Sequence, residues 1–147
     1  MKIVIASDHA AYDMRVAIIK HLVGRRYKVL DMGADKGVTA SDYPDYAIPL
    51  AHNVASGEYK LGILVCGTGI GMSIAANKVK GIRAALCADA FSAKATREHN
   101  DANVLCLGAR VIDIAKALEL VDIFVSTPFS NEDRHTRRIE KIMNNDK

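Results

Sequence analysis

The stretch CGTGIG, residues 66–71, places a cysteine and three glycines within six residues. It follows the apolar run LGILV, which predicts a strand leading directly into the cysteine. Glycine adopts positive φ values and lets a ligand approach the bare backbone. Successive backbone N–H groups in such a turn, at the start of a helix, can hold an oxyanion or a phosphate. The same glycines are also consistent with a tight strand-to-helix turn that binds nothing.

Cys66 is the candidate nucleophile or general base of this stretch. At a strand end that faces a helix N-terminus, the helix dipole and nearby N–H groups favour the thiolate, and Thr68 could hydrogen-bond the sulfur. A free cysteine is otherwise a small buried hydrophobe, and the residues alone leave that interpretation open. Cys87 and Cys106 lie at or within apolar runs without such a loop, so we assign both to the core.

Two histidines stand in polar surroundings, His9 in SDHAA and His99 in REHNDAN. Acid/base or phosphate-binding roles suit Asp8 and His9, because they follow the first predicted strand. A surface or capping role is the alternative for each histidine, and Asp8 can serve as a simple helix N-cap. The chain has neither HExxH nor clustered Cys and His at ligand spacing, so we expect no metal site.

A basic cluster, EDRHTRR at residues 132–138, lies in the last predicted helix. Arg134 and Arg138 are four residues apart and therefore share a helix face, which suits a phosphate clamp. The alternative is a solvated face whose arginines pair with the neighbouring acidic residues. The cluster is too short and too neutralised to indicate nucleic-acid binding.

These residues must be placed by alternating strands and helices, which predict an open parallel α/β sheet with helices on both faces. We expect one domain over residues 1–147 and the strand order 2-1-3-4-5, with a further C-terminal helix. Ligands of such sheets bind at the carboxyl ends of strands where the winding direction reverses, here beside residues 7–11 and 66–71. The strands are predicted at 2–6, 27–31, 61–66, 82–86 and 103–108, and the helices near 11–23, 43–56, 71–79, 91–98, 111–125 and 131–143.

Composition narrows the possible partners. The 20 basic and 17 acidic residues leave a net charge of +3, which favours no polyanion-binding surface. Three cysteines without CxxC spacing fit a reducing cytoplasm, and we expect neither a membrane span nor an export signal. The glycine loop is not the dinucleotide fingerprint, because Met72 stands where GxGxxG needs glycine, so NAD is disfavoured.

Taken together, the motifs resemble the ribose-5-phosphate isomerase B family, within the group that includes galactose-6-phosphate isomerase. The resemblance covers nearly the whole chain in order and spacing. It implies a Rossmann-like fold, a homodimer or dimer of dimers, a sugar phosphate substrate, and neither a metal nor an organic cofactor. The motifs that carry the resemblance are SDHA, SDYPDYA, GILVCGTGIGMSIAANK, REHNDANVLCLGARV and RHTRR.

The resemblance also implies a role for each site residue. Cys66 would move the proton between C2 and C1 with support from Thr68, and His99 with Asp8 would open the sugar ring. Some relatives carry a glutamate base further along the glycine loop, but GMSIAAN has no acid, which favours Cys66. The remaining assignments are Gly67, Thr68, Gly69, Ile70 and Gly71 for the enediolate, His9, Arg134 and Arg138 for the phosphate, and Asn100 and Arg110 for other parts of the substrate.

Two alternatives remain from the sequence, an isomerase of six-carbon sugar phosphates and a nucleotide-binding α/β module without catalysis. The chain carries both the cysteine loop and the HN and RH blocks, which favours a self-sufficient pentose phosphate enzyme. The predicted strands place Cys66 and His99 near opposite edges of the sheet. We therefore expect each active site to be shared between two subunits of a symmetric dimer.

Overall fold

The computed structural model describes residues 1–146, which form one five-stranded parallel sheet in the order β2-β1-β3-β5-β4. Apolar residues alternate between the two faces of its central strands, and both faces are covered by helices. In β3, Ile63 and Val65 point into one core while Leu64 and Cys66 point into the other. The strands are β1 (Lys2–Ser7), β2 (Lys28–Asp31), β3 (Leu61–Cys66), β4 (Ala84–Leu86) and β5 (Val104–Gly108).

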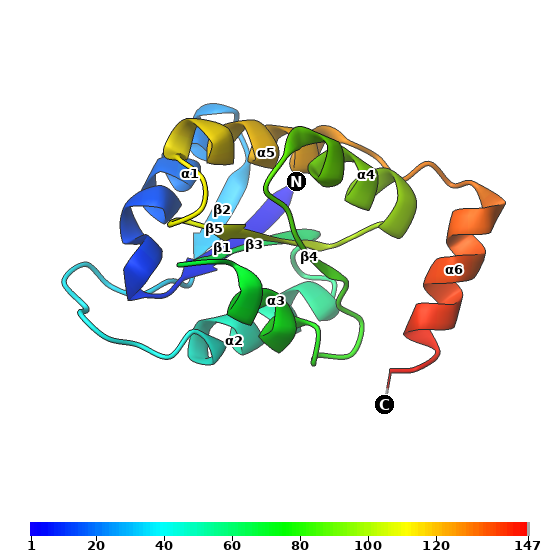
Figure 1. Ribbon diagram of the computed structural model, residues 1–147, viewed down its shortest axis with the longest axis horizontal. Coiled ribbons are helices and arrows are strands. Elements are labelled where there is room, and N and C mark those ends of the chain that lie inside the picture. Colours follow the sequence, from blue (N-terminus) through cyan, green and yellow to red (C-terminus); the bar gives the residue numbers. More distant parts are fainter. Residues whose placement is uncertain (147) are drawn as a thin grey trace.

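Helices α1, α4 and α5 cover one face of the sheet, and α2 and α3 cover the other (Figure 1). Each face thus has its own apolar core, as a doubly wound sheet requires. A short 3₁₀ helix, η1 (His9–Ala11), precedes α1 and was not expected from the sequence. The α-helices are α1 (Tyr12–Gly24), α2 (Pro44–Ala55), α3 (Ile70–Ala76), α4 (Ala90–Asn100), α5 (Ile114–Ser126) and α6 (Asp133–Met143).

The predicted fold class is confirmed, but the predicted order of the last two strands is wrong. β5 lies between β3 and β4, and its residues Val104–Gly108 are all buried. β4 is only three residues long, and Leu86 at its end is 41% exposed. Burial in the middle of the sheet removes more apolar surface from water for β5, which is longer and wholly apolar, than for β4. The short β4 therefore lies at the edge.

Helix α6 stands beside the sheet rather than on either face, next to the C-terminal part of α4 (Figure 1). Along Asp133–Met143, all of which the structure describes, only His135 is buried. Within residues 1–146, none of the helices has the length and apolar character needed to cross a membrane.

Candidate active site

A pocket of about 430 Å³ opens at the carboxyl edge of the sheet, where β1 and β3 end. The candidate residues predicted in the two strand-end loops are brought together here by the structure. The pocket is lined by Asp8, His9, Ala10, Tyr43, Cys66, Gly67, Thr68, Ile70, Gly71, Ile74 and Arg110.

Cys66 is the last residue of β3, and 5% of its surface is exposed. The N–H of Gly69 donates to its Sγ at 3.1 Å. The possible bond from the Thr68 hydroxyl to the sulfur is not formed, and that hydroxyl instead accepts from the N–H of Ile70 at 3.2 Å. The sulfur thus accepts from a backbone donor at the start of α3, and the Thr68 hydroxyl holds the next N–H of the loop.

Glycine is required at two positions around this loop. Gly69 has φ 79°, and a Cβ there would lie 2.5 Å from Leu86 Cδ1 and 2.9 Å from the carbonyl carbon of Leu107. Gly108, at the end of the neighbouring strand, lets the backbone of Thr68 approach, since a Cβ on Gly108 would lie 2.6 Å from the Thr68 carbonyl oxygen. The loop is therefore packed directly against the end of β5.

Asp8 and His9 form the opposite wall of the pocket. The Asp8 carboxylate accepts from the N–H of Ala10 at 3.0 Å and caps η1, while only 7% of the residue is exposed. His9 Nδ1 lies 2.9 Å from the hydroxyl of Ser41, which also accepts from the His9 N–H at 3.0 Å. The capping role of Asp8 is thus observed, and it leaves Asp8 and His9 on the pocket wall.

Ser41 and Tyr43 were not assigned any role from the sequence. Both lie between β2 and α2, where the sequence SDYP offers no periodic pattern that would place them. Ser41 fixes the ring of His9, and Tyr43 packs so closely over Gly71 that a Cβ there would overlap the phenol ring. The pocket therefore has a third wall that comes from a segment without regular secondary structure.

Arg110 lies in the pocket because of the observed strand order. Because β5 pairs directly with β3, the N–H of Ala109 donates to the carbonyl of Cys66 and that of Arg110 to the carbonyl of Gly67, both at 2.9 Å. With β4 between them, as predicted, Arg110 would lie one strand further away. Its guanidinium supplies positive charge beside the glycine loop.

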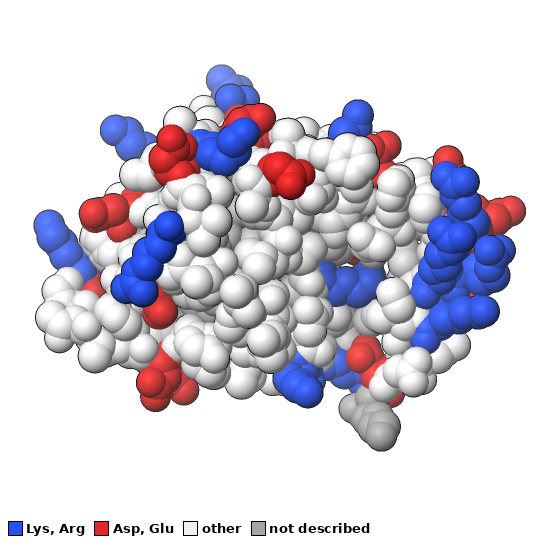
Figure 2. Space-filling view, in the orientation of Figure 1, with Lys and Arg blue, Asp and Glu red and all other residues white. Residues whose placement is uncertain are grey.

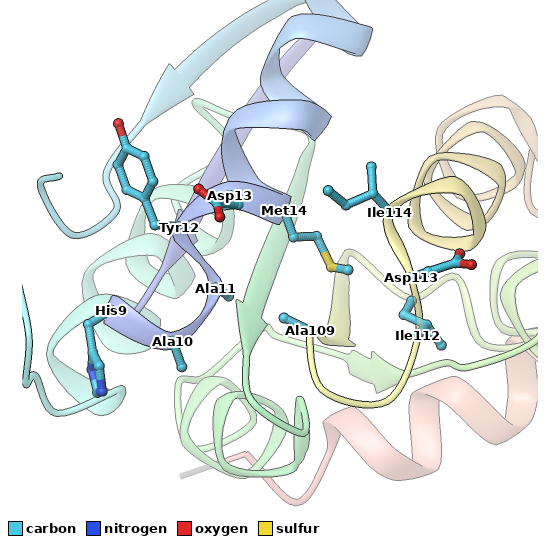
Figure 3. A pocket seen from close by; sticks show the side chains of 10 residues that line it. All are labelled: His9, Ala10, Ala11, Tyr12, Asp13, Met14, Ala109, Ile112, Asp113 and Ile114. Atoms are coloured by element: carbon cyan, nitrogen blue, oxygen red, sulfur yellow. The ribbon is translucent and has the colours of Figure 1, made fainter. Parts of the chain in front are cut away.

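A second pocket of about 310 Å³ adjoins the first along His9 and Ala10 (Figure 3). Its other walls are the start of α1 and the segment between β5 and α5, including Met14 and Asp113. Asp113 caps α5 by accepting from the N–H of Lys116 at 2.8 Å.

His99 and Asn100 lie at the opposite, amino edge of the sheet. The backbone carbonyl of Asn100 accepts from Arg83 Nε at 2.9 Å, and Arg83 directly precedes β4. Val104 pairs with Gly62 and Gly108 with Cys66, so this four-residue step alone spans about 13 Å along the strands. The structure of one chain therefore does not bring His99 and Asn100 to Cys66.

The predicted phosphate ligands of α6 lie with His99. The imidazoles of His99 and His135 stack with their centroids 4.4 Å apart. Glu132 lies 3.0 Å from Arg134 Nη2 and 3.2 Å from His135 Nε2. Lysine and arginine side chains form a continuous stripe over this helix (Figure 2). His99, Arg134 and Arg138 thus gather around His135 as a second group on the same chain, in which Arg134 is paired with Glu132, as the alternative interpretation expected.

The pKa of His135 is lowered from its ordinary value, first by burial and then by the neighbouring His99, Arg134 and Arg138. Glu132 opposes this effect. His135, which is buried and stacks on His99, is therefore stabilised in its neutral form.

A family model described as Ribose/Galactose Isomerase matches residues 3–142. The chain belongs to this family. Ribose-5-phosphate isomerase B of Escherichia coli is 43% identical over 141 residues, which cover 96% of this chain and 93% of that protein.

Solved structures of the isomerase family have the same fold. Ribose-5-phosphate isomerase B of Clostridium thermocellum superimposes with a TM-score of 0.94 at 46% identity, covering 98% of this chain and 96% of that one. The Mycoplasma genitalium protein, whose structure contains bound ribulose-5-phosphate, gives a TM-score of 0.94 at 41% identity, covering 97% and 94% of the two chains.

The other two cysteines of this isomerase-family chain are buried in its cores. Burial, with a smaller effect of Asp89, raises the pKa of Cys87 to about 11. Burial also raises the pKa of Cys106, and its neighbours Cys66 and Cys87 add to that effect. Both thiols are therefore stabilised in the protonated form, which agrees with their assignment to the core.

Proposed function

We propose that the chain interconverts ribose 5-phosphate and ribulose 5-phosphate, with Cys66 as the base. The observation that carries this proposal is the sulfur of Cys66 at the mouth of the glycine loop, in a pocket that also holds Asp8, His9 and Arg110. Aldose–ketose isomerisation needs a base for a weakly acidic C–H proton and donors for the resulting oxyanion. The pocket offers both groups side by side.

The proposed reaction proceeds from the open-chain aldose. The Cys66 thiolate takes the proton from C2, and the C–H electrons form the C1–C2 double bond while the carbonyl oxygen becomes an enediolate oxyanion. The O2 proton then moves to O1, which leaves the negative charge on O2. The O2 lone pair forms the carbonyl at C2, and the electrons of the C1–C2 double bond take the proton back from the thiol at C1. Each step conserves atoms and electrons, and the thiolate is regenerated.

The N–H groups of the glycine loop have different acceptors in this proposal. Those of Gly69 and Ile70 donate to Cys66 Sγ and Thr68 Oγ1, respectively. The first N–H groups of a helix have no partner within it, so that of Gly71 remains for the oxyanion. We assign the N–H groups of Gly67 and Thr68, which precede the helix, to the same oxyanion. An oxyanion donor of this kind contributes about 3 kcal/mol to transition-state stabilisation in comparable sites.

Ring opening and phosphate binding are assigned to the second group of residues, contributed by a partner. In this proposal, His99 of the partner subunit faces Asp8 across a two-fold interface, and the partner's Arg134 and Arg138 meet the substrate phosphate. The support is the separation of the two groups within one chain, together with the arginines that each group contains, Arg110 in the pocket and Arg134 and Arg138 on α6. The same contact, repeated by symmetry, makes the second site.

We also propose that this dimer acts in the cytoplasm. All three cysteines are free and buried, which suits a reducing compartment.

The proposed function is tested by incubating purified protein with EDTA and ribose 5-phosphate and following formation of the ketose. Turnover of ribose 5-phosphate, with galactose 6-phosphate consumed far more slowly, is the expected result. Rapid turnover of galactose 6-phosphate with no ketose from ribose 5-phosphate would assign the chain to the six-carbon branch of the family. Turnover of neither, with a thermal shift on addition of ATP or NAD, would favour nucleotide binding.

A further inference from the structure

Arg15 of α1 is a buried guanidinium that lies outside the candidate pocket. Only 3% of its side chain is exposed. Its Nη1 donates to the Ser7 hydroxyl and its Nη2 to the carbonyl of Ala34, both at 2.6 Å, while its Nε lies 3.1 Å from the carboxylate of Asp31. Burying a charge is costly unless it is paired and hydrogen-bonded. Ser7 and Ala34 supply the hydrogen-bond acceptors, and Asp31 supplies the opposite charge only, because Nε has no hydrogen-bond partner among the described residues.

The first of these partners connects Arg15 to Asp8. Ser7 ends β1 directly before Asp8, and its hydroxyl donates to the carbonyl of Asp8 at 3.0 Å while accepting from Arg15. The backbone of Ser7 also accepts from the N–H of Ala34 at 3.0 Å. Arg15, Ser7 and Ala34 therefore form a closed ring of hydrogen bonds around the carboxyl end of β1.

The second partner connects Arg15 to the loop formed by residues 32–43. This loop has no helix or strand of its own, and it carries Ser41, which holds His9, and Tyr43, which covers Gly71. At its start it is held by the bond of Met32 to Ile5 (2.8 Å), by Ala34, and by Arg15.

Gly33 shows how closely the loop and the guanidinium fit. A Cβ on Gly33 would overlap the Arg15 guanidinium, although the backbone of Gly33 does not have a positive φ. Glycine is needed there for space alone. A lysine at position 15 would keep the charge, but a single ammonium cannot reproduce a planar fork directed at separate acceptors.

We propose that Arg15 is a positioning residue of the active site, which fixes the backbone of Asp8 and the loop that holds His9 and Tyr43. The inference rests on the proposed function, because its consequence is measured on ribose 5-phosphate. His9 is assigned to the phosphate, so a displaced loop weakens substrate binding as well as turnover.

The test compares Arg15→Lys with Leu22→Ala. Leu22 is fully buried on the same helix but lies at its other end, near the amino edge of the sheet. Both variants should lower Tm, which separates loss of stability from loss of positioning. At a temperature where both remain folded, we expect Arg15→Lys to raise KM for ribose 5-phosphate and to lower kcat/KM roughly ten- to a hundredfold. Leu22→Ala should retain the wild-type KM.

Two further variants make the outcome decisive. Gly33→Ala should raise KM in the same way, and it serves as the test if Arg15→Lys does not fold. The double variant Arg15→Lys/Ser41→Ala should lose less than the sum of its single effects, because both changes release His9. Wild-type KM in Arg15→Lys or Gly33→Ala, or fully additive effects in the double variant, would overturn the proposal. An inactive wild-type protein would instead refute the proposed function.

Discussion

Replacing Gly69 by alanine tests whether the conformation of the glycine loop supports catalysis or only folding. Gly57 provides a matched control, because it also has a positive φ, 84° against 79°, but a Cβ on Gly57 would meet nothing within 4 Å. It follows α2 and precedes β3, so it lies at the amino edge of the sheet, away from Cys66. A non-glycine residue at positive φ costs roughly 1–2 kcal/mol, and both variants should lose that much stability.

Gly69→Ala should lose more stability than the positive φ alone costs, because its Cβ would also lie 2.9 Å from the carbonyl carbon of Leu107. Backbone cannot move aside as a flexible side chain can, and overpacking of this kind costs about 1–3 kcal/mol further. We therefore expect losses of roughly 2–5 kcal/mol for Gly69→Ala and roughly 1–2 kcal/mol for Gly57→Ala, measured by urea denaturation.

The activities should differ more sharply than the stabilities. Gly69→Ala moves the N–H that donates to Cys66 Sγ and the neighbouring donors assigned to the oxyanion, and loss of one such donor lowers kcat by roughly 10²- to 10³-fold. Gly57→Ala should keep the wild-type kcat. The assay is isomerisation of ribose 5-phosphate at a temperature where both variants are folded. A Gly69→Ala enzyme with wild-type kcat would refute the reasoning.

Three further results are expected. Cys66→Ala should lose about 10²- to 10⁴-fold in exchange of solvent deuterium into the substrate, while Cys87→Ala remains active; rapid exchange in the Cys66 variant would exclude it as the base. Arg134→Ala should lower kcat/KM roughly ten- to more than a hundredfold through loss of a charge-assisted hydrogen bond, and equal effects of Arg134→Ala and Arg137→Ala would contradict a specific phosphate ligand. Acid should destabilise the protein through His135, because its folded pKa lies below the ordinary 6.5, so the unfolded chain binds the proton first as the pH falls through that value. Urea midpoints at pH 7.5 and 5.5 should differ less in His135→Asn than in the wild type, and an unchanged difference would contradict this.

The sheet and most of its helices could be predicted because their signals are local. Strands such as β3 are continuous apolar runs, and helix ends coincide with Gly24 and Pro44. The order of β4 and β5 is a long-range property, set by which strand gains more from burial. The apolar run of β5, compared with the Arg83 that precedes the short β4, is the signal that could have indicated it.

The site residues that lie at the ends of strands could be predicted from the sequence. Those whose contacts depend on an irregular loop could not. Asp8, His9 and Cys66 directly follow or end their strands, so topology alone brings them together. Ser41 contacts His9 at a sequence separation of 32 residues, and Arg15 contacts Ala34 at a separation of 19. A periodic pattern of apolar residues does not predict such contacts. Arg110 could not be explained until the strand order was known.

The central claim is that each active site joins the pocket of one chain to the His99 group of another. The direct test is to mix inactive Cys66→Ala and inactive His99→Asn chains after dissociation and reassociation. Half of the dimers are then mixed, and each carries one site with both residues intact, so about a quarter of wild-type activity should return. No recovered activity, with subunit exchange confirmed by mass spectrometry, would place the whole site in one chain and contradict the account.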